Sequence, residues 1–144
     1  ASCLVGSEMC IRDSEITESA SITEKKILLD NMNALRKVGV RFALDDFGTG
    51  QSNLSYIVDM PIDIVKFDRG MTNAYFDNGK GKPVMDAAMG MIQKLKLEIV
   101  SEGIEEKEQF AKLDELGIDY IQGYYFSKPR NAAEFISFIE SNNA

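Results

Sequence analysis

Short apolar runs alternate with segments of helical periodicity along most of this 144-residue chain. The apolar runs predict strands at residues 40–44, 62–67, 98–101 and 120–126. The periodic segments predict helices over residues 21–38, 54–58, 84–95, 106–116 and 132–139. Gly39 and Gly117 follow two of these helices and are typical of helix C-terminal ends. Repeated alternation of this kind predicts parallel strands joined by helical crossovers, and therefore an α/β fold.

Three local signals mark where these elements begin and end. Ser21 and Glu24 have the spacing of a capping box at the start of the first helix. Pro61 follows the short helix at 54–58 and is typical of a chain that leaves a helix. The stretch NGKGKP at residues 78–83 predicts a loop.

Polar residues capable of chemistry lie at the carboxyl-terminal ends of successive predicted strands. They are Asp45, Asp46, Lys66, Asp68, Glu102 and Gln122. A (β/α)8 barrel places its active site at that end, and an open doubly wound sheet also binds ligands there. Acids and a lysine at four successive strand ends favour the barrel. A complete barrel needs about 250 residues, so this chain is expected to form only part of one.

Composition excludes several classes of function. The 16 basic and 23 acidic side chains give a formal net charge of -7, which argues against charge-driven binding of nucleic-acid polymers. The sequence contains no histidine, which excludes Ser-His-Asp and Cys-His catalysis. Two cysteines, Cys3 and Cys10, are too few for a zinc site without histidine. Any catalysis is therefore expected to use carboxylates, lysine or metal ions.

Asp45 and Asp46 allow two interpretations. One acid could cap the following turn while the other is solvated. Alternatively, adjacent residues on an extended backbone point to opposite sides, so the two carboxylates could serve two different metal ions. Divalent cations such as Mg²⁺ and Mn²⁺ prefer oxygen ligands of this kind.

The other polar positions also allow a structural alternative. Lys66 and Asp68 share one face of a strand and could form a cross-strand salt bridge, or hold a water beside a metal-bound carboxylate. The structural alternative for an acid here is a position at the start of a helix, where the helix dipole favours negative charge. This alternative suits Glu105 better than Glu102, because Glu102 lies where the strand ends. Gln122 could simply hydrogen-bond backbone groups in a buried turn.

Two further regions belong to the candidate site. Glu15 and Glu18, in the stretch EITES, precede the first predicted helix and could lie at the end of another strand. Gly48 and Gly50 suit a turn with positive φ or a close approach to a ligand. The phosphate-binding pattern GxxxxGK[ST] is absent from the sequence.

Five stretches together resemble one family, the EAL-domain phosphodiesterases, which cleave the bacterial second messenger cyclic di-GMP. The stretches are EITES (15–19), FALDDFGTGQSNLSYI (42–57), PIDIVKFDR (61–69), IVSEGIEEKEQ (99–109) and DYIQGYYFSKP (119–129). They occur in the order and at the spacing of that family. The resemblance implies the C-terminal half of a TIM-like barrel, with a two-metal site for Mg²⁺ or Mn²⁺.

The resemblance also implies ligand roles for the acids. Glu15 and Asp45 resemble ligands of the first metal. Asp46 resembles a ligand of the second metal, with Asp68 close to it. Glu102 resembles the essential acid of the family, acting as general base, metal ligand or both.

The remaining matched residues resemble supporting groups. Lys66 resembles the lysine that positions the attacking water, and Gln122 a residue that holds the water network of the second metal. Glu105 resembles an acid that supports the metal ligands from behind. Glu18 resembles the glutamate that anchors the DDFGTG loop, whose residues Gly48, Thr49 and Gly50 are expected near the substrate.

Two features depart from the family pattern. The Glu-Ala-Leu motif and an asparagine of the first metal site are absent from this sequence. Residues 1–13 match no part of the family, resemble translated sequencing adapter, and are expected to form a non-native leader before a partial domain at 14–144. We therefore expect an active parent hydrolase that opens cyclic di-GMP to linear pGpG, and an inactive 144-residue chain.

The resemblance further implies a cytoplasmic homodimer, and it leaves open whether the parent carries fused GGDEF or sensory domains and whether it is tethered to a membrane through them. Two other functions compete with hydrolysis. One is an EAL-like module that binds cyclic di-GMP without cleaving it. The other is a different barrel enzyme, such as an aldolase that forms a Schiff base at Lys66. Retention of the matched acids, lysine and glutamine favours the hydrolase.

Overall fold

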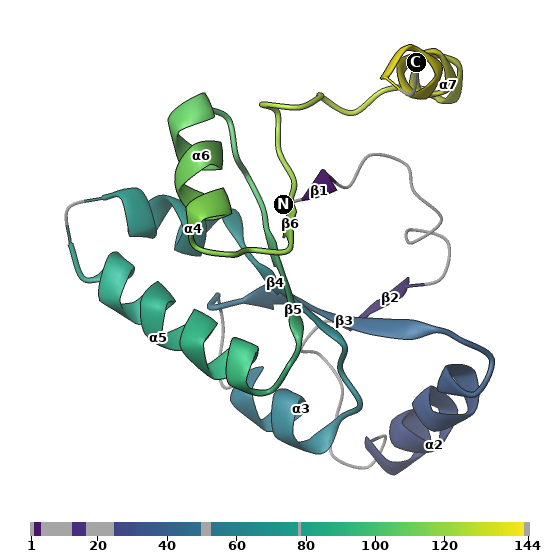
Figure 1. Cartoon of the computed structure of the whole chain (residues 1–144). Helices are drawn as coiled ribbons and strands as arrows, with labels where there is room; N and C mark the ends of the chain where they lie inside the picture. Colours follow the sequence, from purple (N-terminus) through teal and green to yellow (C-terminus); the bar gives the residue numbers. More distant parts are fainter. Residues whose placement is uncertain (1, 4–12, 17–24, 50–52, 78, 143–144) are drawn as a thin grey trace.

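A single parallel sheet organises the described part of the chain (Figure 1), which comprises residues 2–3, 13–16, 25–49, 53–77 and 79–142 of the computed structural model. Its strands are β1 (Ser2–Cys3), β2 (Asp13–Ile16), β3 (Arg41–Phe47), β4 (Ile64–Phe67), β5 (Glu98–Ser101) and β6 (Tyr120–Ile121). The helices are α2 (Lys25–Arg36), α3 (Asn53–Asp59), α4 (Arg69–Phe76), α5 (Gly81–Lys94), α6 (Lys107–Glu115) and α7 (Ala132–Asn142).

The strands are arranged in the order β1-β6-β5-β4-β3-β2, so β2 to β6 are neighbours in space as well as in sequence. Every pairing in the sheet is parallel. Successive right-handed crossovers that advance in one direction place their helices on one face of a sheet. The predicted parallel α/β architecture is therefore confirmed.

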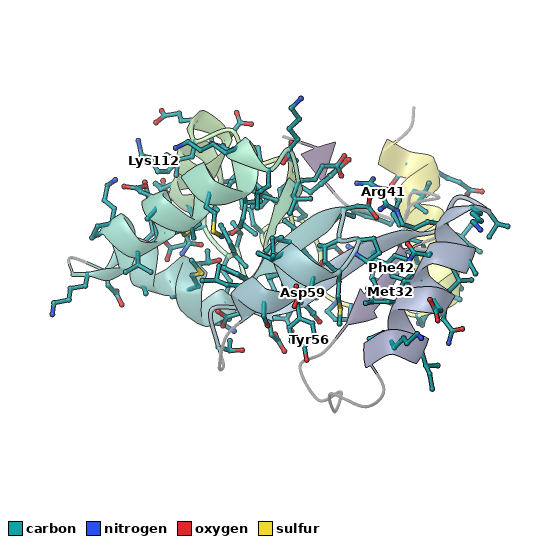
Figure 2. The ribbon with its side chains drawn as sticks, turned by 90° about the horizontal axis from the view of Figure 1, so that it is seen from below. Met32, Arg41, Phe42, Tyr56, Asp59 and Lys112 are labelled. Atoms are coloured by element: carbon teal, nitrogen blue, oxygen red, sulfur yellow. The ribbon has the colours of Figure 1, made fainter. Side chains whose placement is uncertain are left out.

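Helices α2 to α6 pack their apolar side chains against one face of the sheet. Phe42 of β3, Phe67 of β4 and Ile99 of β5 meet Met32 of α2 and Ile92 of α5 in this core. Met32 and Phe42 are labelled in Figure 2. Helix α7 lies apart from α4, α5 and α6 in both views (Figures 1 and 2).

The opposite sheet face, which we call the inner face, carries a smaller apolar cluster. Ala43, Ile64 and Val100 are buried there, with Tyr120 packed against them. At the amino ends of the strands this face carries the ion pair between Arg41 and Glu98. Side chains alternate between the faces along each strand, so the residues that follow this apolar layer at the carboxyl ends also belong to the inner face.

Two aspartates at the amino ends of the strands fix the register of the sheet. Asp63 Oδ2 accepts a hydrogen bond from the Phe42 N–H at 2.9 Å, and its other oxygen pairs with Arg36 at 2.8 Å. Asp119 Oδ2 accepts from the Ile99 N–H at 2.8 Å. Each aspartate precedes one strand and binds the strand before it. A slip of one residue would break these bonds and move the inner-face polar residues into the helix-side core.

The elements differ from the sequence predictions in several places. Strand β3 extends three residues beyond the predicted strand, to Phe47, and the two-residue strand β1 was not predicted. Helix α4 was not predicted, and α5 begins at Gly81 inside the predicted loop. Pro83 is tolerated there because the first helical turn does not need its missing N–H. The strand predicted at 120–126 ends at Ile121. The predicted capping box at Ser21 and Glu24 lies outside the described residues.

No helix in the described residues is long and apolar enough to cross a bilayer. This finding agrees with the short apolar runs of the sequence.

Burial predicts which isoleucines stabilise the fold. Ile99→Ala, at a fully buried position of β5, should lower the free energy of unfolding by about 2–5 kcal/mol. Ile27→Ala is the matched control, because Ile27 is 65% exposed on α2 and its loss should change stability by less than about 0.5 kcal/mol. Urea titration followed by circular dichroism measures both values, and equal losses would contradict the assignment of the core.

Candidate active site

Three charged side chains meet at the carboxyl ends of β3, β4 and β5 on the inner face. Lys66 Nζ lies 3.0 Å from Asp45 Oδ1 and 2.8 Å from Glu102 Oε1. The exposed fractions of these side chains are 12% for Lys66, 18% for Asp45 and 25% for Glu102. Two carboxylates and one ammonium leave a net negative charge in a partly buried cluster. We call these three residues the ionic cluster.

The local sequence explains why these charges converge. Ala43, Ile64 and Val100 each lie two residues before a member of the ionic cluster: Asp45 and Lys66 are on β3 and β4, and Glu102 directly follows the last residue of β5. Period-two alternation therefore carries the charged residues onto the inner face, directly beyond the apolar layer. This apolar layer keeps water away from one side of the cluster. Each carboxylate therefore needs a nearby positive charge to offset the cost of burying its own charge.

The strand bends where the two aspartates stand side by side. Leu44 pairs with Val65 and Phe47 with Phe67, so β3 has one residue more than β4 between these pairs. The extra residue forms a bulge, and Asp46 adopts a positive φ of 53°. The prediction that Asp45 and Asp46 point to opposite sides assumed an extended backbone, and this assumption is wrong at Asp46. Positive φ costs energy in a residue other than glycine and is often found at functional sites.

The turn after this bulge folds back onto Asp46. Thr49 donates to the Asp46 carbonyl oxygen from its backbone N–H at 3.2 Å and from its hydroxyl at 2.9 Å. Gly48 has a φ of 104°, and a Cβ at that position would lie 2.8 Å from the Sδ of Met71. Of the two predicted reasons for glycine here, a positive φ and a close approach to a ligand, the structure confirms the positive φ at Gly48. Gly50 lies outside the described residues.

Asp68 lies one residue beyond β4 and caps helix α4. Its carboxylate accepts from the backbone N–H of Gly70 at 2.6 Å and of Met71 at 3.0 Å. Of the two residues considered for a cross-strand salt bridge, Lys66 forms one, with Asp45 and with Glu102. Asp68 caps α4 instead. A carboxylate retains further lone pairs when it caps a helix, so the cap leaves Asp68 able to accept another partner.

Glu105 and Gln122 lie on the loops that flank the ionic cluster. Glu105 Oε1 pairs with Arg69 at 2.8 Å. Gln122 is exposed, and its backbone N–H donates to the Ser101 carbonyl at 2.9 Å. The suggested buried turn at Gln122 is therefore wrong.

Only the backbone of Glu15 is described by the structure. Residue 15 of β2 pairs with Ala43 of β3. The side chain of Glu15 and the whole of Glu18 lie outside what the structure describes.

Two pairs of residues near the site were not anticipated from the sequence. Arg69 contacts the loop that follows Glu102, as its ion pair with Glu105 shows. Thr72 and Ser101 are fully buried, and their hydroxyl oxygens lie 3.0 Å apart. A clue to Arg69 was its position directly after Asp68, but a single surface arginine carries no signal of its own.

The donor set suits a hard divalent cation in its chemistry. Asp45 and Glu102 present carboxylate oxygens to one shared positive charge, and oxygen is the ligand that Mg²⁺ and Mn²⁺ prefer. No group of three acidic or cysteine side chains gathers into a metal-binding arrangement within the part of the chain that the structure describes. The ionic cluster therefore supplies two of the oxygen donors that such a cation needs.

The chain is similar to known proteins in both sequence and fold. A family model described as EAL domain matches residues 13–129. "Probable cyclic di-GMP phosphodiesterase PdeG" of Escherichia coli K12 is 36% identical over 127 residues, which cover 88% of this chain and 25% of PdeG.

Two solved structures extend the comparison to the fold. The EAL domain of Mycobacterium smegmatis DcpA matches with a TM-score of 0.81 at 31% identity, over 90% of this chain and 58% of DcpA's. The phosphodiesterase PaMucR in complex with c-di-GMP matches with a TM-score of 0.73 at 32% identity, over 85% of this chain and 49% of its own. The chain thus spans about half of these solved chains, and the expected part of a TIM-like barrel is confirmed.

The ionic cluster predicts that replacing Lys66 lowers the free energy of unfolding more than replacing Lys94 does. Lys66→Met should lower the free energy of unfolding by about 1–3 kcal/mol, because two partly buried carboxylates lose their shared partner. Lys94→Met, at an exposed position of α5, is the matched control and should change it by less than about 0.5 kcal/mol. Chemical denaturation at neutral pH measures both, and an unchanged stability of Lys66→Met would remove the basis for the cluster.

Proposed function

The chain belongs to the EAL-domain family, and on that basis we propose that it supplies part of the active site of a metal-dependent phosphodiesterase that hydrolyses cyclic di-GMP to linear pGpG. The observation that carries the proposal is the convergence of Asp45, Lys66 and Glu102 at three neighbouring strand ends. The phosphodiesterase name of PdeG and the c-di-GMP bound to PaMucR support the choice of reaction and substrate.

Carboxylates of this chain would hold Mg²⁺ or Mn²⁺. Glu15 and Asp45 would bind one ion and Asp46 a second, with Asp68 close to it, while Glu102 would act as proton acceptor, metal ligand or both. Such ions, when bound, offset the negative charge of a phosphodiester and lower the pKa of a bound water. The net negative charge of the ionic cluster and the oxygen donors on it support this assignment.

The chain's own residues would orient and deprotonate the attacking water. The Lys66 ammonium already bridges Asp45 and Glu102, so it can hold a water or phosphate oxygen beside both. Glu102 lies within reach of the same position and would accept the proton of that water. Gln122 lies on the loop after the neighbouring strand and would hydrogen-bond the water network.

The loop after β3 would contact the substrate. Gly48 and Thr49 form a turn closed on the Asp46 carbonyl, so the loop's position is coupled directly to a proposed metal ligand. Gly50 and the proposed anchor Glu18 would complete this loop. Helix α3 follows it and exposes Leu54 and Val58, two apolar residues one turn apart, which supports the expectation that the protein is a homodimer.

Replacement of Glu102 tests the proposed reaction. In the protein expressed from its complete gene, Glu102→Gln should lower kcat for conversion of cyclic di-GMP to pGpG by about 10²- to 10⁴-fold, because the proton acceptor is lost. Glu115→Gln, at an exposed position of α6, is the matched control and should retain activity. Chromatographic detection of pGpG in the presence of Mn²⁺ measures both.

The same assay separates hydrolysis from simple binding. Calorimetric binding of cyclic di-GMP without pGpG formation by the unmodified protein would indicate a receptor and overturn the proposed hydrolysis. The 144-residue chain assayed alone should give no pGpG, because the ionic cluster supplies only two converging acids and the Glu-Ala-Leu motif is absent from it.

A further inference from the structure

We propose that Arg69 is a positioning residue for Glu102: it clamps the turn between β5 and α6 from the outside and so fixes the carboxylate in the ionic cluster. This inference rests on the proposed function in so far as Glu102 binds metal or accepts a proton. Arg69 itself lies outside the ionic cluster and contacts the turn through Gly103 and Glu105.

The aliphatic stem of Arg69 lies against the backbone of Gly103, the residue directly after Glu102. A Cβ at position 103 would stand 2.4 Å from the Cγ of Arg69 and 2.7 Å from its Cβ. Real Cβ atoms do not approach other atoms so closely, so this contact requires glycine. Gly103 also has a φ of 77°, which other residues rarely adopt. The stem and the glycine therefore fit one another at the residue next to Glu102.

The guanidinium of Arg69 holds the far side of the same turn. Its Nη2 lies 2.8 Å from Glu105 Oε1, and both side chains are largely exposed. Within the turn, the Glu102 N–H donates to the Phe67 carbonyl at 3.0 Å, and the Ile104 N–H donates to the Gln122 carbonyl at 3.2 Å. Arg69 thus contacts the turn at Gly103 and Glu105, while Lys66 pairs with Glu102 within the ionic cluster.

The clamp has a rigid base. Arg69 is the first residue of α4, whose N-terminus is capped by the Asp68 carboxylate. One turn later, Thr72 is joined to Ser101 by the buried hydroxyl pair. The first turn of α4 is therefore fixed to the end of β5 by a buried bond, and Arg69 extends from that turn over Gly103.

The exposed ion pair of Arg69 is expected to add little to the free energy of unfolding. Exposed ion pairs contribute little to folding, whereas groups that orient a metal ligand commonly change metal affinity by about 10- to 100-fold when they are removed. The long aliphatic stem of an arginine or a lysine can lie along a surface while the charged end reaches an exposed partner. A positioning role therefore predicts that metal affinity changes while the unfolding midpoint does not.

The test uses the 144-residue chain and two readouts. Arg69→Ala should weaken Mn²⁺ binding, measured by electron paramagnetic resonance, by about tenfold. It should also speed hydrogen exchange of the Glu102 and Ile104 amides without changing exchange of the core Ile99 amide. Arg69→Lys keeps the charge and most of the stem and should restore most of the loss.

Lys112→Ala is the matched control. Lys112, labelled in Figure 2, forms an exposed ion pair with Glu115 at 2.9 Å on α6. The hydrogen bond to Glu115 raises the pKa of Lys112, so Lys112→Ala removes a charged side chain from an exposed ion pair. This variant should alter neither Mn²⁺ affinity nor exchange of the Glu102 amide.

The outcomes separate this inference from the proposed function. If the unmodified chain binds no Mn²⁺, the metal assignment fails for this chain, and exchange at Glu102 and Ile104 alone decides the role of Arg69. Faster exchange in Arg69→Ala then supports the clamp, and unchanged exchange overturns it. If the chain binds Mn²⁺ and Arg69→Ala binds it equally well, positioning is overturned whatever the exchange rates.

Discussion

The ion pairs of Lys66 with Asp45 and Glu102 are the interaction on which the site depends. They join the carboxyl ends of β3, β4 and β5 on a face that is apolar one layer below. Charges in such a position are costly unless they are paired, so the lysine makes two partly buried carboxylates compatible with the fold. The two carboxylates together carry more charge than the one ammonium, and this excess negative charge would attract a divalent cation.

The rest of the structure serves to bring these three side chains to one place. Asp63 and Asp119 pin neighbouring strands at their amino ends, and period-two alternation then determines which side chains reach the inner face at the other end. The bulge at Asp46 ends regular pairing beside the cluster. Register, which is fixed far from the site, therefore decides the composition of the site.

Much of this arrangement could be predicted from the sequence, because apolar runs and acids at strand ends follow simple periodicities. The strand at 98–101 and the helix before Gly117 were predicted within a residue of their observed bounds. Helix α4 was missed because Asp68 was considered as a ligand and not as a cap. The bulge at Asp46 and the contact of Arg69 with Gly103 depend on strand pairing and three-dimensional approach, which leave no periodic signal in one sequence.

The most direct test of the central claim is a double-mutant cycle between Asp45 and Lys66. Free energies of unfolding are measured for the chain, for Asp45→Asn, for Lys66→Met and for the double variant. Direct contact predicts a coupling energy of about 1 kcal/mol or more, since paired charges in one network do not act independently. Losses that add within about 0.4 kcal/mol would show that the two side chains do not form the pair on which the site is built.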